Sequence, residues 1–192
     1  MRRIPVGLSL LCAALTACTT TRTLPLHYVP SDAARAQAGR TIPISMGDVQ
    51  DRRANPGSTI GTMHSGVGKT TKILETNQPL TAVVRQFFID ALEQQNSYSP
   101  NSPNQIQVEI LDFQADQLIR RDVSINLLVT LRDARTGRTR ATAPVKVQKA
   151  QGGLLNADNL VRGNVSAFQR FVEQALSEAV DEGVRKVAPP AP

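Results

Sequence analysis

Apolar residues recur every three or four positions in two stretches of the chain, and this spacing predicts two amphipathic helices. The first covers residues 80–94, where Asn77 is expected to be the N-cap and Pro79 to lie in the first turn. The second covers roughly residues 164–184. The predicted buried stripes consist of Leu80, Val83, Val84, Phe87, Phe88, Ala91 and Leu92 in the first helix, and Val165, Phe168, Val172, Ala175, Leu176 and Ala179 in the second.

Alternating apolar and polar residues predict the strands. In the second half of the chain the alternation shifts phase at Leu111, as a β-bulge would cause. Gly137 ends a hairpin loop and is expected to supply a positive φ, and Pro144 predicts an edge strand. The predicted strands cover residues 41–46, 60–63, 71–74, 106–113, 123–131 and 141–147.

This order of elements predicts the fold class. Short strands are followed by a helix, a three-stranded meander and a second helix. Each strand has one apolar face and each helix one apolar stripe, so the helices bury most surface by lying together on one face of the sheet. We therefore expect a two-layer α+β domain, with an antiparallel sheet and two amphipathic helices on one face.

The first eighteen residues have the pattern of an export signal. Arg2 and Arg3 precede an apolar run at positions 4–15 that is too short to span a bilayer, and small residues follow it. The sequence Leu-Thr-Ala-Cys at positions 15–18 resembles a bacterial lipobox, which implies cleavage before Cys18, a thioether to diacylglycerol and acylation, typically by palmitate. Several acyl chains on one residue give essentially permanent anchoring.

The pattern predicts four segments. These are a signal peptide at 1–17, a lipidated Cys18 with a flexible tether at 18–40, one α+β domain at 41–187 and a disordered tail at 188–192. An apolar run at 24–29 within the tether is a candidate for docking on the domain as an extended segment. Cleavage removes Cys12, which leaves Cys18 as the sole cysteine and excludes a disulfide.

The residue after Cys18 indicates which membrane would hold the lipid anchor. In bacterial lipoproteins an aspartate after the lipidated cysteine favours retention in the inner membrane, and this chain has Thr19 there. We therefore expect anchoring in the outer membrane, on its periplasmic face. An ordinary secretory signal with a chance cysteine is the alternative.

Charge narrows the range of partners. The chain of 192 residues has 22 basic and 16 acidic residues, and loss of Arg2 and Arg3 leaves 20 − 16 = +4. The predicted periplasmic location argues against nucleic acid and leaves envelope proteins or anionic glycolipids as partners. The candidate anion-facing patch consists of Arg120, Arg121, Arg132, Arg135, Arg138 and Arg140, although a solvated strand rim would have the same composition.

Catalytic and cofactor motifs lack the necessary residues. The segment at 64–71 resembles a phosphate-binding loop, but Met63 stands where that loop requires its first glycine, so we expect no nucleotide. His27 and His64 are the only histidines and lie in separate segments, which leaves no material for a metal site or a histidine-based triad. We expect no catalytic residues, no metal and no cofactor.

The chain resembles the YajG-type family of proteobacterial lipoproteins over residues 42–182. The resemblance rests on Val-Gln-Asp-Arg at 49–52, the amphipathic stretch 80–94, the sequence Gln-Ile-Gln-Val-Glu-Ile at 105–110, the alternation that follows, and the closing helix. It implies an outer-membrane lipoprotein without enzyme activity or catalytic residues. This chain departs from the family in its Gly-Lys-Thr-Thr loop and its arginine-rich hairpin.

Together these observations predict a non-enzymatic lipoprotein of the envelope. It would bind or support an envelope protein or a lipid assembly machine from its position on the outer membrane. A periplasmic hydrolase acting on the cell wall, or the regulator of one, is the alternative. That function would require a polar cleft that holds a nucleophile and a base together.

Overall fold

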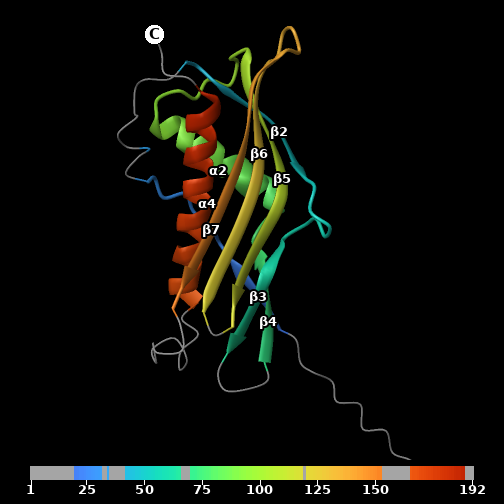
Figure 1. Cartoon of the computed structure of the whole chain (residues 1–192), viewed down its shortest axis with the longest axis vertical. Coiled ribbons are helices and arrows are strands. Elements are labelled where there is room, and N and C mark those ends of the chain that lie inside the picture. The colour runs from blue at the N-terminus through green and yellow to red at the C-terminus, as the bar shows by residue number, and fades with distance from the viewer. Residues whose placement is uncertain are drawn as a thin grey trace, which may run out of the picture.

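The fold consists of two helices against one long, twisted sheet (Figure 1). The computed structural model describes residues 20–31, 34, 42–65, 70–118, 120–152 and 165–188. The elements are β1 (Thr20–Leu24), β2 (Ser45–Asp51), β3 (Thr59–Ser65), β4 (Thr70–Thr76), α2 (Leu80–Gln94), β5 (Asn104–Gln117), β6 (Arg121–Asp133), β7 (Thr139–Gln151) and α4 (Val165–Val187).

The sheet is mixed rather than antiparallel. Its strand order is β1-β4-β3-β5-β6-β7, and β2 also pairs with β5. The β3–β4, β5–β6 and β6–β7 pairs are antiparallel, whereas β1–β4, β2–β5 and β3–β5 are parallel. The chain passes through α2 between β4 and β5, and such a crossover allows β5 to run parallel to strands that precede the helix. The α+β prediction is confirmed, but the prediction of an antiparallel sheet is wrong for these three pairs.

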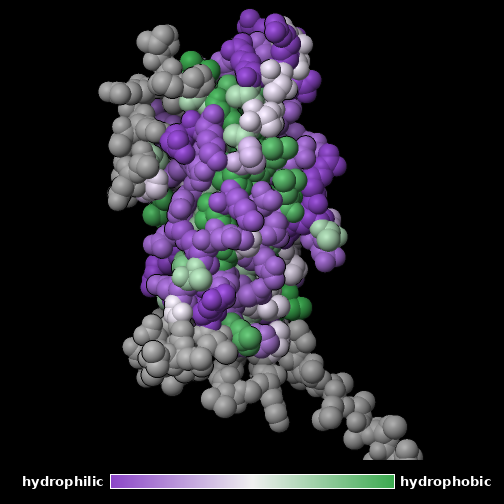
Figure 2. Space-filling view, viewed as in Figure 1, coloured by the Kyte–Doolittle hydropathy of each residue, from purple (hydrophilic) through white to green (hydrophobic). Residues whose placement is uncertain are grey.

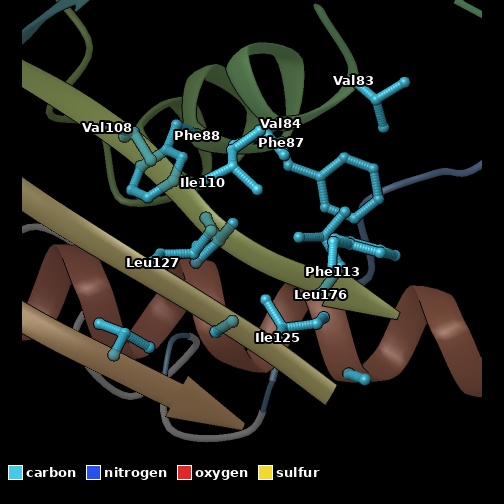
Figure 3. Close-up of a cluster of buried hydrophobic side chains, with 14 of the residues drawn as sticks. Val83, Val84, Phe87, Phe88, Val108, Ile110, Phe113, Ile125, Leu127 and Leu176 are labelled. Atoms are coloured by element: carbon cyan, nitrogen blue, oxygen red, sulfur yellow. The ribbon is translucent and has the colours of Figure 1, made fainter. Parts of the chain in front are cut away.

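The core lies between the helices and one face of the sheet (Figure 3). Phe87 and Phe88 of α2 lie over the strands, where Ile125 and Leu127 point toward the helices, and Leu176 of α4 joins the same cluster. All seven residues of the stripe predicted for α2 are buried. The N-terminus of this helix differs from the prediction. Pro79 is the N-cap without a side-chain hydrogen bond, and Asn77 lies in the preceding turn.

Strand β5 has two partners along one edge. β2 pairs with its first half and β3 with its last residues, because β6 occupies the other edge along the whole length. Arg53 lies at the junction between the two pairings. Its guanidinium donates to Asp51 Oδ2 at 2.8 Å, to the carbonyl of Thr59 at 2.8 Å and to the carbonyl of Phe113 at 3.4 Å. The Arg53 side chain, held in a buried ion pair with Asp51, thus satisfies backbone carbonyls at the point where the pairing of β5 changes from β2 to β3.

Two backbone irregularities in this region have clear causes. The predicted bulge is confirmed, since the β5–β6 register shifts between Ile110 and Asp112. Gly61 has a φ of +154°, and a Cβ at this position would lie 2.0 Å from the carbonyl oxygen of Ala115. Glycine is therefore required where β3 begins to pair with β5.

Candidate functional site

Helix α4 carries a polar stripe that is buried. Glu173, Ser177 and Asp181 have exposed fractions of 6%, 1% and 7%. A spacing of four places them on one face of the helix, along its length. Buried carboxylates need hydrogen-bond partners, and the stripe therefore indicates that another segment covers it.

The covering segment is an N-terminal strap, residues 25–31, that runs along α4. Its N–H groups at positions 27, 29 and 31 donate in turn to Glu173 Oε1 at 3.2 Å, Ser177 Oγ at 3.0 Å and Asp181 Oδ2 at 3.0 Å. Two residues of extended chain advance about 6.6 Å, and four residues of helix advance about 6 Å. The two repeats match closely, so each second N–H of the strap meets one polar side chain of the stripe.

Apolar contacts hold the strap and the strand before it. Leu24 is fully buried and Leu26 is 8% exposed. Tyr28 donates its hydroxyl to Asp181 Oδ1 at 2.6 Å, and its ring packs edge-on against Phe87 with the ring centroids 6.0 Å apart. The predicted docking of residues 24–29 is therefore confirmed.

Two boundaries of the predicted segments change as a result. Residues 20–31 form β1 and the strap, so the prediction of a flexible tether is wrong for them, and β1 begins at Thr20, two positions after Cys18 in the sequence. At the other end Ala188 is 5% exposed and continues the hydrogen bonding of α4, so it belongs to the fold. Cys18 and residues 189–192 lie outside the described residues.

The pairing register shows what lies beside Thr20. One row of paired residues crosses the sheet at the end where β1 begins, and we call this the anchor end. The β5–β6 turn lies at this end, and the β6–β7 hairpin tip lies at the opposite end (Figure 1). The row consists of Thr20, Lys72, Met63, Gln117, Arg121 and Gln151.

The six candidate arginines do not form one patch. Arg120 and Arg121 lie at the anchor end, whereas residues 132–140 lie at the hairpin tip. Strand β6 separates the two groups by roughly 35 Å, from a rise of about 3.3 Å per residue. The predicted single anion-facing patch is therefore divided between opposite ends of the molecule.

The two arginines at the anchor end have different environments. Arg121 is only 9% exposed and donates from Nη1 to Gln151 Oε1 at 3.3 Å, so it is part of the sheet rather than a surface cation. Arg120 is exposed, and its Nε lies 2.8 Å from Asp122 Oδ2. Of this pair, Arg120 alone presents its charge to solvent.

The hairpin tip is an ordered basic loop. Asp133 accepts hydrogen bonds from Arg140 Nη2 at 2.6 Å and from the N–H groups of Arg135 at 3.0 Å and Thr136 at 3.1 Å. The Arg140 guanidinium, followed by the two N–H groups, lowers the pKa of Asp133 from 3.8 to about 2. Gly137 has the predicted positive φ of 72°. The tip therefore holds a fixed shape around one carboxylate.

The charge at the tip is exposed. Arg132, Arg135 and Arg138 are solvent-exposed, and Arg132 Nε donates to the carbonyl of Gly137 at 2.8 Å. Of the four arginines at the tip, only Arg140 forms an ion pair with a carboxylate of the described residues. In Figure 2 this end of the molecule is strongly hydrophilic. The tip combines a rigid backbone with three solvated cations, which is a suitable surface for an anionic partner.

A polar hollow lies on the sheet near its anchor end, over β5, β6 and β7. Its volume is about 480 Å³, and its lining includes Asp116, Asp122 and Arg120. Asp116 and Asp122 are opposite each other in the β5–β6 register. Each carboxylate has its own donors, since Thr62 donates to Asp116 Oδ1 through N–H and hydroxyl at 2.8 Å each, and Arg120 donates to Asp122. These donors offset the cross-strand repulsion.

Three further findings concern chemistry and membrane insertion. Within the described ranges, no group of three or more histidine, cysteine, aspartate or glutamate residues is placed to hold a metal ion. No described helix is long and apolar enough to cross a bilayer. Residues 66–69 of the phosphate-loop-like segment lie outside the described residues, and Thr70 begins strand β4 rather than the helix that a phosphate-binding loop opens.

Comparison with known proteins supports the fold. No family model and no curated protein matches the chain. The fold is similar to that of XCC0632 from Xanthomonas campestris, of family DUF330, with a TM-score of 0.59, 16% identity, and coverage of 86% of this chain and 92% of that one. The resemblance to the YajG-type family stays a prediction.

Two more distant matches are also solved structures. Lipoprotein GNA1162 from Neisseria meningitidis matches with a TM-score of 0.29 and 9% identity, over 71% of this chain and 96% of that one. The PelC dodecamer from Paraburkholderia phytofirmans matches with a TM-score of 0.43 and 6% identity, over 79% and 92%. At these TM-scores neither match establishes a shared fold or a shared role.

Proposed function

We propose that this chain is a non-enzymatic lipoprotein on the periplasmic face of the outer membrane, which presents the β6–β7 hairpin tip to an envelope protein. The observation that supports this most directly is the opposition of the two ends. Strand β1 begins at one end of the sheet, two positions after Cys18 in the sequence, and the exposed arginines project at the other end. Lipid at Cys18 would thus hold the basic tip away from the membrane.

The geometry of the tip favours a binding role. Arg135 and Arg138 are exposed on a loop whose backbone Asp133 and Gly137 fix. A preorganised loop loses little conformational entropy on binding, and exposed guanidinium groups pair with carboxylates or phosphates through two parallel hydrogen bonds. Both properties suit recognition of an acidic surface.

The anchoring half of the proposal has a direct test. Cells that express the chain are labelled with a palmitate analogue, and their envelope is separated into inner and outer membranes. We expect label on the native chain, in the outer-membrane fraction, and neither label nor membrane association for Cys18→Ser. Equal membrane association of the two proteins, or absence of label from both, would contradict lipid anchoring.

The binding half is tested by position-specific crosslinking in cells. A photo-crosslinking amino acid at Arg135 samples the tip, and one at Lys146, which is exposed on β7, is the matched control. We expect an adduct of defined mass with one envelope protein at Arg135 and no such adduct at Lys146. The identified protein should bind the purified chain and lose affinity several-fold with Arg135→Ala and Arg138→Ala. Glycolipid adducts at Arg135, or the same adducts at both positions, would refute a protein partner at the tip.

A further inference from the structure

The β5–β6 turn at the anchor end carries an exposed leucine. Leu118 is 65% exposed, against 43% for Val29 and 40% for Leu111, the other large apolar side chains exposed in the described part of the chain. Tight turns normally consist of glycine, proline, asparagine, aspartate or serine. Here the connection reads Gln-Leu-Ile-Arg-Arg at 117–121. Most of the apolar surface of Leu118 stays in water after folding, so burial of this surface in a contact outside the chain would be favourable.

Strand directions place Leu118 on the side of the predicted lipid. β5 ends in the row at the anchor end and β1 begins there, so Leu118 follows β5 at the same end of the sheet at which the chain enters β1 at Thr20. Two residues of chain reach at most about 7 Å, so a lipidated Cys18 would hold Thr20 close to the headgroups. Three strand spacings separate Thr20 from Gln117, which is about 14 Å. The turn therefore faces the bilayer whenever the anchor is inserted.

The charge beside Leu118 suits a bilayer surface. Arg120 has a side chain 61% exposed and donates from Nε to Asp122, and its two terminal amino groups make no hydrogen bond among the described residues. Lys149, on the adjoining end of β7, pairs with Glu178. Arg120 thus retains donors for phosphate next to an apolar side chain, and this pairing is typical of segments that lie at a membrane interface.

We propose that the β5–β6 turn is a second membrane contact, in which Leu118 enters the interfacial region of the bilayer and Arg120 binds the phosphates of anionic lipids. The inference rests on the lipid anchoring proposed above. One leucine binds a membrane weakly by itself, but an anchor that holds it at the surface makes its insertion effectively intramolecular. Two contacts, at Cys18 and at the turn, fix the orientation of the sheet relative to the membrane, which one flexible anchor would leave free.

The sequence offers a clean probe because the chain contains no tryptophan. The lipidated Leu118→Trp protein is purified from envelopes and reconstituted into vesicles of phosphatidylethanolamine and phosphatidylglycerol, with and without brominated acyl chains that quench tryptophan. Leu111→Trp is the matched control, since Leu111 is also exposed and lies on β5, about 20 Å before the strand ends. We expect quenching several-fold stronger at position 118 than at 111, reduced by Arg120→Gln in anionic vesicles but not in zwitterionic ones.

The outcomes separate the two proposals. Equal quenching at positions 118 and 111 in protein that remains bound to vesicles would overturn the membrane contact and leave the anchor intact. Quenching that Arg120→Gln does not alter in anionic vesicles would overturn the role of the arginine. Native protein that carries no acyl chains, or that behaves as Cys18→Ser does, would instead overturn the proposed function. Shielding of position 118 in native envelopes but not in pure lipid would assign the turn to a protein partner and so also overturn the contact.

Discussion

Tyr28→Phe measures how strongly the N-terminal strap is held on α4. The substitution removes one hydroxyl that donates to Asp181 Oδ1 at 2.6 Å and retains the ring against Phe87. A hydrogen bond to a charged group contributes about 1.5–3 kcal/mol, and the half-buried position of Tyr28 places the loss near 2 kcal/mol. Because Ser31 N–H still donates to Asp181 Oδ2, the carboxylate keeps one partner.

Hydrogen exchange of the strap amides is the suitable measurement, since a strap can open without unfolding of the core. The N–H groups of Val29 and Ser31 donate to α4 and report this opening. A loss of about 2 kcal/mol corresponds to roughly 30-fold faster exchange at both positions. Tyr98→Phe is the control, since Tyr98 is the other tyrosine of the chain and its hydroxyl has no hydrogen bond among the described residues.

The comparison between the two variants decides the question. Unchanged exchange at positions 29 and 31 in Tyr28→Phe would refute the assigned strength of the Tyr28–Asp181 bond. An equal acceleration in Tyr98→Phe would show that loss of any tyrosine hydroxyl loosens the fold, and it would refute the specific role of the strap.

Two other predictions concern single positions in the sheet. Gly61→Ala places a Cβ 2.0 Å from the carbonyl oxygen of Ala115 at a φ of +154°, so we expect a loss of more than about 3 kcal/mol in urea unfolding, and a loss below 1 kcal/mol would contradict this geometry. Arg140→Gln removes the main cause of the low pKa of Asp133 and leaves the N–H donors of Arg135 and Thr136, so the carboxyl resonance in NMR should titrate above about 2, shifted toward 3.8. Because the folded pKa of Asp133 is depressed, its contribution to stability is present above pH 4 and is lost as the pH falls toward 2, and the variant should show less of this loss in the same window.

The helices and the meander could be predicted because burial alone determines the spacing of their apolar residues. The stripe from Leu80 to Leu92 follows the helical repeat, and the alternation from Val123 to Leu131 follows the pleat of a strand with one buried face. Even the bulge at Leu111 was visible as a change of phase. The parallel pairs were not predictable in this way, because β2 and β3 share one edge of β5 and each is too short to indicate its neighbour.

The burial of the polar stripe on α4 could not be predicted from the sequence of that helix alone. Glu173, Ser177 and Asp181 have the composition of a solvated face, although all three are buried. Their burial depends on a segment about 150 residues away in the chain. One local signal was present, since Leu24, Leu26 and Tyr28 alternate with a period of two, as expected for an extended segment with one buried face.

The prediction of a single arginine patch was wrong for a related reason. Residues 120–140 are close in sequence, but two long hairpins place Arg120 and Arg135 at opposite ends of the sheet. The same hairpins bring Arg121 beside Gln151, thirty positions away. Distance along a strand, rather than distance in sequence, decides which charges form a surface.

The parallel pairing of β1 with β4 also determines how the domain would respond to mechanical tension. A pull between a lipid at Cys18 and a partner on the hairpin tip would run along the strands and load the evenly spaced, slanted hydrogen bonds between β1 and β4. In this shear geometry the bonds from Thr20 to Leu24 resist together rather than opening one after another. The strap adds the three bonds to α4 in series behind them. The bonds of β1 and of the strap would therefore resist tension that is directed away from the membrane.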